Sequence, residues 1–262
     1  MFRDVMGPDE VFQEKYKCHH FMKLTYLFID LITVAIPFSF SFHRGIKFNK
    51  EFSAFFSANF ISALSFIIWD VIFTAKGVWG FNEKFIIGIN VYNLPLEEIL
   101  FFICIPFACV FTYRYLNSKF RKGWNENVEK RMTILFISIF FIAGVWFWKR
   151  TYTATTFISF SLLLLLIRFI FQQGWIGSLY RAWLLLLLPF FIVNGILTGT
   201  GLSSPVVWYN DEEIIGIRIL TIPVEDIIYG FELVMLTIFF YELFRSFFKA
   251  SEENKVTLIV QR

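Results

Sequence analysis

Seven stretches of the chain are apolar over lengths that suit membrane crossing, because a helix of about 20 apolar residues spans a bilayer core. They lie at 22–42, 52–75, 95–116, 132–149, 152–171, 181–199 and 223–248. Only Lys149 and Arg150 separate the fourth stretch from the fifth, but one continuous helix there would far exceed the bilayer thickness. The pattern predicts an all-α polytopic membrane bundle of about seven transmembrane helices.

The polar positions between these stretches repeat along the chain. Residues 70–77 match residues 194–201 at an offset of 124, and Pro95 matches Pro223 at an offset of 128. Each copy contains three helices, and the extra helix between them restores the chain direction. The sequence therefore predicts two parallel three-helix repeats plus a linking helix, with a shared site between the halves. The expected segments are an N-terminal polar tail (1–21), a first repeat (22–117), a basic loop with the linking helix (118–150), a second repeat (151–248) and a C-terminal tail (249–262).

A proline followed by two acids opens the third and the seventh helix. The copies comprise Pro95, Glu97 and Glu98 in the first repeat, and Pro223, Glu225 and Asp226 in the second. Such acids can simply complement the positive end of a helix. Acids at the edge of a bilayer core are costly, however, and they indicate a functional site by default. Apolar burial and a neighbouring carboxylate favour the neutral form, so we expect at least one general acid beside a carboxylate base.

Other residues of the same membrane end can support this chemistry. Asp70 and Asn194 take matching places in the two repeats, where either can hydrogen-bond an acid of its own repeat or simply face interfacial water. Glu232 follows Glu225 and Tyr229 on one face of the last helix, and a bond to another helix is the alternative interpretation for it. The aromatic residues singled out are Trp69, Trp79, Phe101 and Tyr229. Their rings suit either an interfacial belt or a cationic intermediate.

Composition removes several classes of function. The chain is 57% hydrophobic with a mean hydropathy of +0.62, and its net charge of +3 is dispersed, which argues against nucleic-acid binding. We find no phosphate-binding loop, no aspartate-rich diphosphate motif and no metal-ligand spacing, so we expect neither a cofactor nor a metal. The last apolar stretch, 223–248, contains no lysine that could form a Schiff base, which argues against a retinal protein. Lysine and arginine are more numerous in the loops on the side of the C-terminus, which predicts a multi-pass inner-membrane protein with its N-terminus outside.

Three motifs carry a resemblance to a known family. They are Phe42-His43-Arg44, the segment Trp69-Asp70-x-x-Phe73-Thr74 with its continuation Gly77-Val78-Trp79-Gly80-Phe81-Asn82, and Pro95-Leu96-Glu97-Glu98-x-x-Phe101-Phe102. The chain resembles the membrane-embedded lycopene cyclases of the heterodimer type, with both halves fused, and residues 223–226 resemble the motif of the second half. Asn194 in place of an acid, and Tyr229 in place of phenylalanine, argue against equal roles for the halves.

The resemblance implies a lycopene β-cyclase, an intramolecular lyase or isomerase of carotenoid biosynthesis. Its substrate would be lycopene or a similar linear C40 polyene, within membrane lipid. The resemblance leaves association with other carotenoid enzymes open. A proton adds to a ψ end group, the tertiary cation closes a six-membered ring, and loss of a ring proton gives the β end group. The donor and the base are expected among Glu97, Glu98, Glu225 and Asp226, with individual roles open because such acids titrate together.

Two other functions fit parts of the pattern. A related carotenoid hydratase would capture the same cation with water, which makes the product heavier. A proton-coupled transporter would use parallel repeats with intramembrane acids, and a polar pathway inward from Glu232 would favour it. A cyclase predicts loss of activity in Glu97→Gln or Glu225→Gln variants that still insert into the membrane. The number of substrate ends that react stays open.

Overall fold

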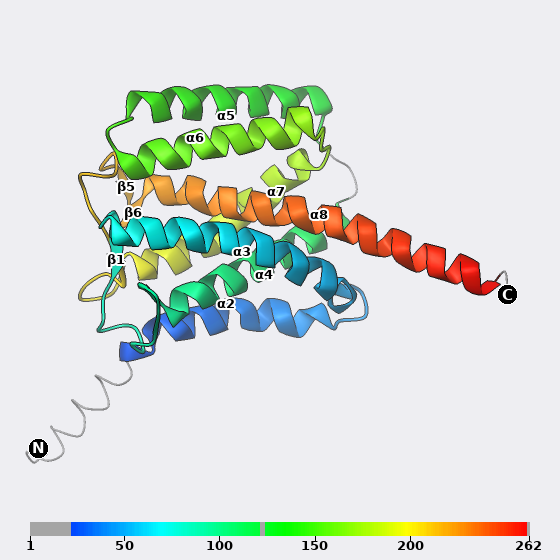
Figure 1. Cartoon of the computed structure of the whole chain (residues 1–262), viewed down its shortest axis with the longest axis horizontal. Coiled ribbons are helices and arrows are strands. Elements are labelled where there is room, and N and C mark those ends of the chain that lie inside the picture. Colours follow the sequence, from blue (N-terminus) through cyan, green and yellow to red (C-terminus); the bar gives the residue numbers. More distant parts are fainter. Residues whose placement is uncertain (1–21, 121–123, 261–262) are drawn as a thin grey trace, which may run out of the picture.

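The computed structural model describes residues 22–120 and 124–260, with side chains as far as Ser251. Within these residues seven helices lie side by side in one bundle (Figure 1). They are α2 (Thr25–Ser41), α3 (Phe52–Ala75), α4 (Leu96–Lys119), α5 (Glu126–Trp146), α6 (Thr151–Leu165), α7 (Ile176–Leu197) and α8 (Val224–Val260). A 3-10 turn, η1 (Phe48–Glu51), leads into α3, and a π-helical turn, η2 (Leu166–Ile170), extends α6. The predicted all-α membrane bundle is confirmed.

The helices extend beyond the apolar stretches at several ends. The linking helix α5 begins at Glu126 instead of residue 132, because the Asn125 side chain caps it by accepting the amide of Asn127 at 2.9 Å. Helix α8 continues to Val260, so the segment expected as a C-terminal tail from residue 249 is largely helical. Apolarity alone does not detect these polar turns. The expected N-terminal tail, residues 1–21, lies outside the described residues.

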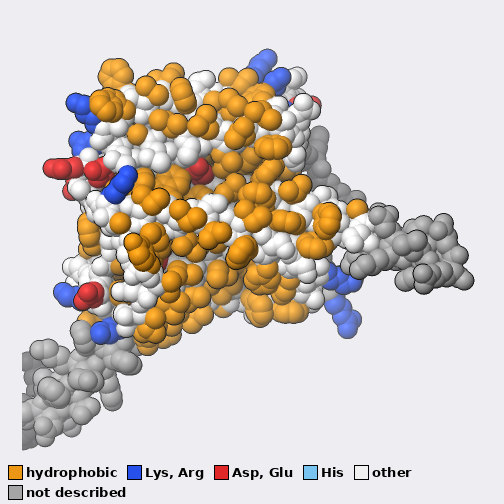
Figure 2. Space-filling view, in the orientation of Figure 1, with side chains coloured by type: hydrophobic (Ala, Val, Ile, Leu, Met, Phe, Trp, Pro, Cys, Tyr) orange, Lys and Arg blue, Asp and Glu red, His pale blue; other side chains and the backbone are white. Residues whose placement is uncertain are grey.

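The surface of the bundle matches a membrane environment. Five helical segments are long and apolar enough to cross a bilayer, namely Phe48–Ala75, Leu96–Lys119, Thr151–Ile170, Ile176–Leu197 and Val224–Ser251. Helix α2 is apolar but shorter. Apolar side chains cover the flanks of the helices in Figure 2, whereas charged side chains gather near the two ends of the bundle. The chain is therefore a membrane protein.

A short strand pair joins the two repeats at one end of the bundle. Strand β1 (Trp79–Phe81) pairs antiparallel with β4 (Val207–Tyr209), and Gly80 lies opposite Trp208. These two residues are equivalent under the repeat offset of 128, so the pairing is unchanged when the halves are exchanged. Such self-complementary pairing is typical of a two-fold axis. The internal repeat expected from the sequence is thus present in the fold.

A tight hairpin precedes each of the helices that carry the acid pairs. Strands β2 (Asn90–Val91) and β3 (Leu94–Pro95) pair before α4, and β5 (Arg218–Ile219) and β6 (Ile222–Pro223) pair before α8. Both prolines end a strand immediately before the helix, so they precede the first turn instead of lying within it. The loops leading into the hairpins turn at Gly88 and Gly216, whose φ angles of +91° and +87° suit glycine. Each acid pair is therefore fixed at a helix start by its own hairpin.

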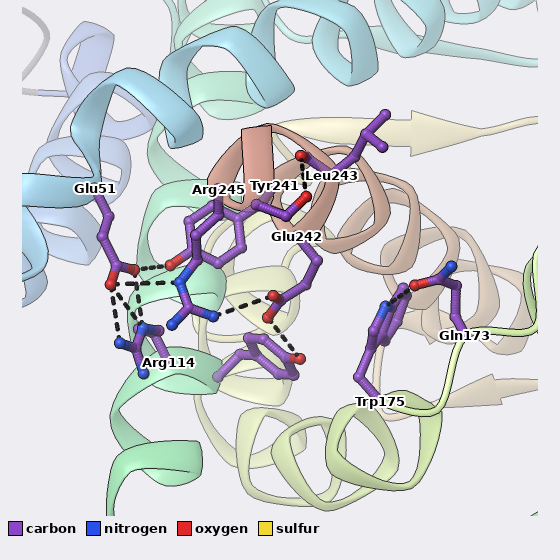
Figure 3. A network of polar contacts seen from close by, with 10 residues as sticks. Glu51, Arg114, Gln173, Trp175, Tyr241, Glu242, Leu243 and Arg245 are labelled. Atoms are coloured by element: carbon purple, nitrogen blue, oxygen red, sulfur yellow. Dashed lines mark hydrogen bonds and ion pairs between the residues drawn. The ribbon is translucent and has the colours of Figure 1, made fainter. Parts of the chain in front are cut away.

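A polar network fastens the opposite end of the bundle (Figure 3). Arg114 of α4 donates to Glu51 at 2.8 Å, and the phenol of Tyr241 on α8 also donates to Glu51. Arg245 donates to Glu242 at 3.1 Å one turn further along α8. Because the guanidinium of Arg114 contacts both oxygens of Glu51, the pair has the bidentate geometry of strong ion pairs. This network holds the start of α3 against the end of α4 and the middle of α8.

Close contact at the strand pair generates the first prediction. A Cβ atom added at Gly80 would overlap the indole of Trp208, with 2.7 Å to its Cε2 atom. We expect Gly80→Ala to lower the free energy of unfolding by about 1–3 kcal/mol, as is usual for overpacking. Thermal unfolding of the purified protein in detergent measures this. Gly174→Ala is the matched control, because a Cβ atom there meets nothing within 4 Å. Equal melting temperatures for the two variants would contradict the close packing.

Candidate functional site

An elongated, mainly apolar cavity of about 130 Å³ lies beneath the strand pair, between α2, α4, α7 and α8. Its polar end is lined by residues of both repeats, among them Glu98 of α4 and Asp226 of α8. From there it follows α4 as far as Cys109 and α7 as far as Trp183. Eleven residues of helix correspond to roughly 16 Å. The cavity is therefore a narrow groove with its carboxyl groups at one end.

The two acids of each pair point in different directions, as neighbouring positions on a helix must. Glu98 and Asp226 line the cavity, whereas Glu97 and Glu225 bind the loops that precede their helices. Glu97 accepts the amide of Ile87 at 2.6 Å, and Glu225 accepts the equivalent amide of Ile215 at 2.7 Å. One oxygen of each of these two glutamates is buried without a hydrogen-bond partner. The pairs thus divide into a cavity acid and a loop acid.

Asp226 is held by three donors. Tyr152 of α6 donates at 2.7 Å, Asn194 of α7 at 2.8 Å and Tyr209 of β4 at 2.9 Å. Burial, reinforced by the nearby Asp226 carboxyl, raises the pKa of Tyr209 well above its usual value near 10. Its phenol therefore stays protonated and continues to donate at every physiological pH. Three donated bonds are the arrangement that suits an ionised carboxylate.

Glu98 has a simpler set of contacts. It accepts one hydrogen bond, from the phenol of Tyr26 on α2, at 2.5 Å. Asp70 of α3 lines the same cavity and accepts the indole N–H of Trp79, but its other oxygen has no partner. Asn194 therefore binds the acid of its own repeat as expected, whereas Asp70 binds Trp79 instead. The exchange of Asp70 for Asn194 between the repeats makes the surroundings of the two cavity acids unequal.

The remaining residues expected at the site separate into two groups. The rings of Trp79, Phe101 and Tyr229 line the cavity. Trp69 lies outside it and packs edge-on against Tyr229, with 5.4 Å between ring centroids. Glu232 also lies outside the cavity, where it accepts a hydrogen bond from Ser159 of α6 at 3.0 Å. That contact is the interhelical bond considered as the alternative interpretation for Glu232.

Sequence reasoning missed Tyr26 and Tyr152, two of the three phenols that donate to the cavity acids. Both follow a threonine at the start of the first helix of their repeat, as Thr25-Tyr26 and Thr151-Tyr152. Their amides also bond equivalent carbonyls, those of Phe85 and Glu213, at 3.2 and 3.0 Å. The repeated threonine–tyrosine pair, at an offset of 126, is the signal that could have identified them.

The arrangement can move protons to and from an apolar molecule. Three carboxyl groups and four phenols line the apolar groove, and further aromatic rings stand beside them. Within the described residues no group of three or more histidine, cysteine, aspartate or glutamate side chains could hold a metal ion. General acid–base chemistry on an apolar substrate is what these side chains can perform.

Comparison with known proteins gives one match. The family model described as lycopene cyclase matches residues 23–116 and 149–244, which together are well over half of the chain. The first segment covers α2 to α4, and the second covers α6 to α8 as far as Phe244, so each match corresponds to one structural repeat. No curated protein and no solved structure matches the chain.

The division into cavity acids and loop acids can be tested without any activity assay. We expect Glu97→Ala to increase hydrogen exchange at the amide of Ile87, because its side-chain acceptor is removed. Glu225→Ala should have the same effect at Ile215. Exchange followed by mass spectrometry of the protein in detergent measures both. Glu98→Ala is the matched control and should leave the loop that contains Ile87 protected. Equal loss of protection in Glu97→Ala and Glu98→Ala would contradict the division.

Proposed function

The chain belongs to the lycopene cyclase family, and we propose that it closes β rings at the ψ ends of lycopene by acid–base catalysis. The observation that carries this proposal is that Glu98 and Asp226, one from each repeat, line a single apolar cavity. The family implies a carotenoid polyene as the substrate. The groove suits one end of such a molecule, since it is narrow and mainly apolar, with its carboxyl groups at one end.

We assign Glu98 as the proton donor and Asp226 as the base. Asp226 receives three hydrogen bonds, which favour its ionised form, whereas Glu98 receives one. A carboxyl group with few donors in an apolar environment is stabilised as the neutral acid. The assignment follows the difference in hydrogen bonding between two groups of the same type.

The reaction on this assignment is an isomerisation in which no atom is gained or lost. Glu98 gives its proton to the terminal double bond of the ψ end group, which leaves a tertiary carbocation. The π electrons of a nearby double bond attack this cation and form the ring bond, so the positive charge moves into the ring. Asp226 removes a ring proton, and the C–H electron pair becomes the ring double bond of the β end group. Return of a proton from Asp226 to Glu98 restores the starting state. The products are γ-carotene after one closure and β-carotene after two.

The walls of the cavity support the charged intermediate. Trp79, Phe101 and Tyr229 present aromatic rings at the acid end, and ring faces attract a cation. The mainly apolar walls also offer few hydrogen-bond partners to water, which would otherwise capture the cation and give a hydrated product. With the N-terminus outside, the acid pairs would lie near the outer face of the inner membrane.

Replacement of the cavity acids should stop the reaction. We expect Glu98→Gln and Asp226→Asn to lower the cyclisation rate at least about 100-fold, because each amide loses the proton transfer of its carboxyl group. Glu97→Gln and Glu225→Gln should keep more activity, since the amide oxygen can still accept the loop N–H. This ranking departs from the sequence-based expectation that either loop acid is essential. Expression in a lycopene-accumulating bacterium, with chromatography and mass detection, measures the products.

Two controls define how this experiment is read. Glu83→Gln, at an exposed loop position, should convert lycopene like the unaltered protein, and immunoblots of membranes confirm insertion of every variant. A cyclised product keeps the mass of lycopene but absorbs at shorter wavelength. A product heavier by one water would identify a hydratase instead. Full activity of both Glu98→Gln and Asp226→Asn would overturn the proposed mechanism.

A further inference from the structure

The two-fold repeat creates two helix interfaces at equivalent positions, but the packing of side chains differs between them. The interface of α4 with α7 corresponds to that of α8 with α3 when the halves are exchanged. The cavity lies at the first of these interfaces, where α8 also contributes to its wall, and it is lined by the cavity acids of both repeats. The second interface is packed, with Phe66, Phe102 and Leu233 forming its buried cluster. Of these two equivalent interfaces, one therefore holds the cavity and the other is packed.

Two pairs of equivalent residues account for the difference in packing. Trp69 of α3 corresponds to Val193 of α7 at the offset of 124, and Val193 lines the cavity. Phe102 of α4 corresponds to Gly230 of α8 at the offset of 128, and Gly230 also lines the cavity. In each pair the large aromatic ring packs against the α3–α8 interface, and the small residue lines the cavity. The rings of Trp69 and Phe102 fill the packed interface, and Val193 and Gly230 supply no ring of that size to the cavity.

The packed interface is closed by specific contacts. The ring of Tyr229 lies 5.0 Å from that of Phe66 and 5.4 Å from that of Trp69, both edge-on. Two turns deeper, Thr237 of α8 donates to Ser62 of α3 at 2.9 Å. The residues equivalent to these two in the open interface are Cys109 and Leu186, which line the cavity. The hydrogen bond that holds the packed interface together has no counterpart in the open one.

The open interface leaves little spare room beside Gly230. A Cβ atom there would lie 3.1 Å from the ring of Phe190 and 3.4 Å from that of Trp183. A large side chain at this position would therefore have to occupy the groove itself. Val193 of α7 and Gly230 of α8 both line the groove near its acid end.

We infer that Val193 and Gly230 open the single reaction pocket of this chain, so that the two ends of the polyene are cyclised one after the other in the same pocket. This inference rests on the proposed function and adds the order of events. A rigid C40 polyene is much longer than a groove of roughly 16 Å, so it cannot turn round inside it. The monocyclic carotenoid leaves the pocket after the first closure, and it re-enters with its open end first if a second ring is to form.

Filling the pocket tests the first half of the inference. We expect Val193→Trp and Gly230→Phe, which place the residues of the packed interface into the open one, to lower both ring closures at least 100-fold. Val193→Phe, a smaller change, covers the case in which the tryptophan variant does not fold. Ile192→Trp is the matched control, because its side chain is 58% exposed on the same helix and should retain activity. Lycopene and γ-carotene are supplied separately to the purified protein in lipid vesicles.

The outcome with each substrate is diagnostic. If a second centre existed between α3 and α8, the pocket-filling variants would still form one ring on lycopene, and that result would overturn the inference. If the monocyclic product leaves the pocket after the first closure, it accumulates in the membrane. With the unaltered protein and excess lycopene, we therefore expect the concentration of γ-carotene to exceed that of the enzyme before the concentration of β-carotene does. β-Carotene from the first turnovers, with γ-carotene never above the enzyme concentration, would also overturn it. No cyclised product from the unaltered protein would contradict the proposed function itself, and the order of closures with it.

Discussion

The four carboxyl groups of the two acid pairs lie buried at one end of this membrane bundle, and each must be hydrogen-bonded or kept neutral there. The structure meets this requirement in two ways. The loop acids Glu97 and Glu225 take backbone amides that would otherwise be unpaired, and so they fix the hairpins that start α4 and α8. The cavity acids Glu98 and Asp226 take phenol donors from the first helix of their own repeat. The hairpins, the helix starts and the cavity wall all follow from these contacts.

The strand pair β1–β4 sets how the halves meet. It is self-complementary about Gly80 and Trp208, so it places the two repeats around a two-fold axis without deciding where a pocket will form. The difference arises lower in the bundle, where side-chain size is no longer the same in both repeats. Trp69 and Phe102 fill one interface, while Val193 and Gly230 leave the other open. The symmetric backbone therefore sets how the two halves are arranged, and the unequal side chains decide which interface holds the cavity.

Much of the fold could be predicted from the sequence, since apolar length and the repeat offset determine helix number and the parallel arrangement of the halves. The meeting of Glu98 with Asp226 also follows from that arrangement. The division of labour within each acid pair does not, because adjacent carboxyl groups look alike until a loop amide such as that of Ile87 is known to bind one of them. Tyr26 and Tyr152 were missed because a tyrosine at a membrane helix end usually belongs to the interfacial belt. Their partners 72 and 74 positions away could not be read from local patterns.

Because the site contains residues from both repeats, the contact between the repeats determines the distance between its two acids. In the proposed reaction, proton addition and proton removal act on the same end group of the substrate, so Glu98 and Asp226 would need a fixed separation although they belong to different repeats. Helix α5, which links the repeats, packs on α6 and takes no part in lining the cavity. The separation of the acids is instead set by the strand pair, by Tyr209, which reaches from β4 to Asp226, and by the packed interface of α3 with α8. For the proposed reaction, the packed interface of α3 with α8 would then be the contact that holds Glu98 and Asp226 in register.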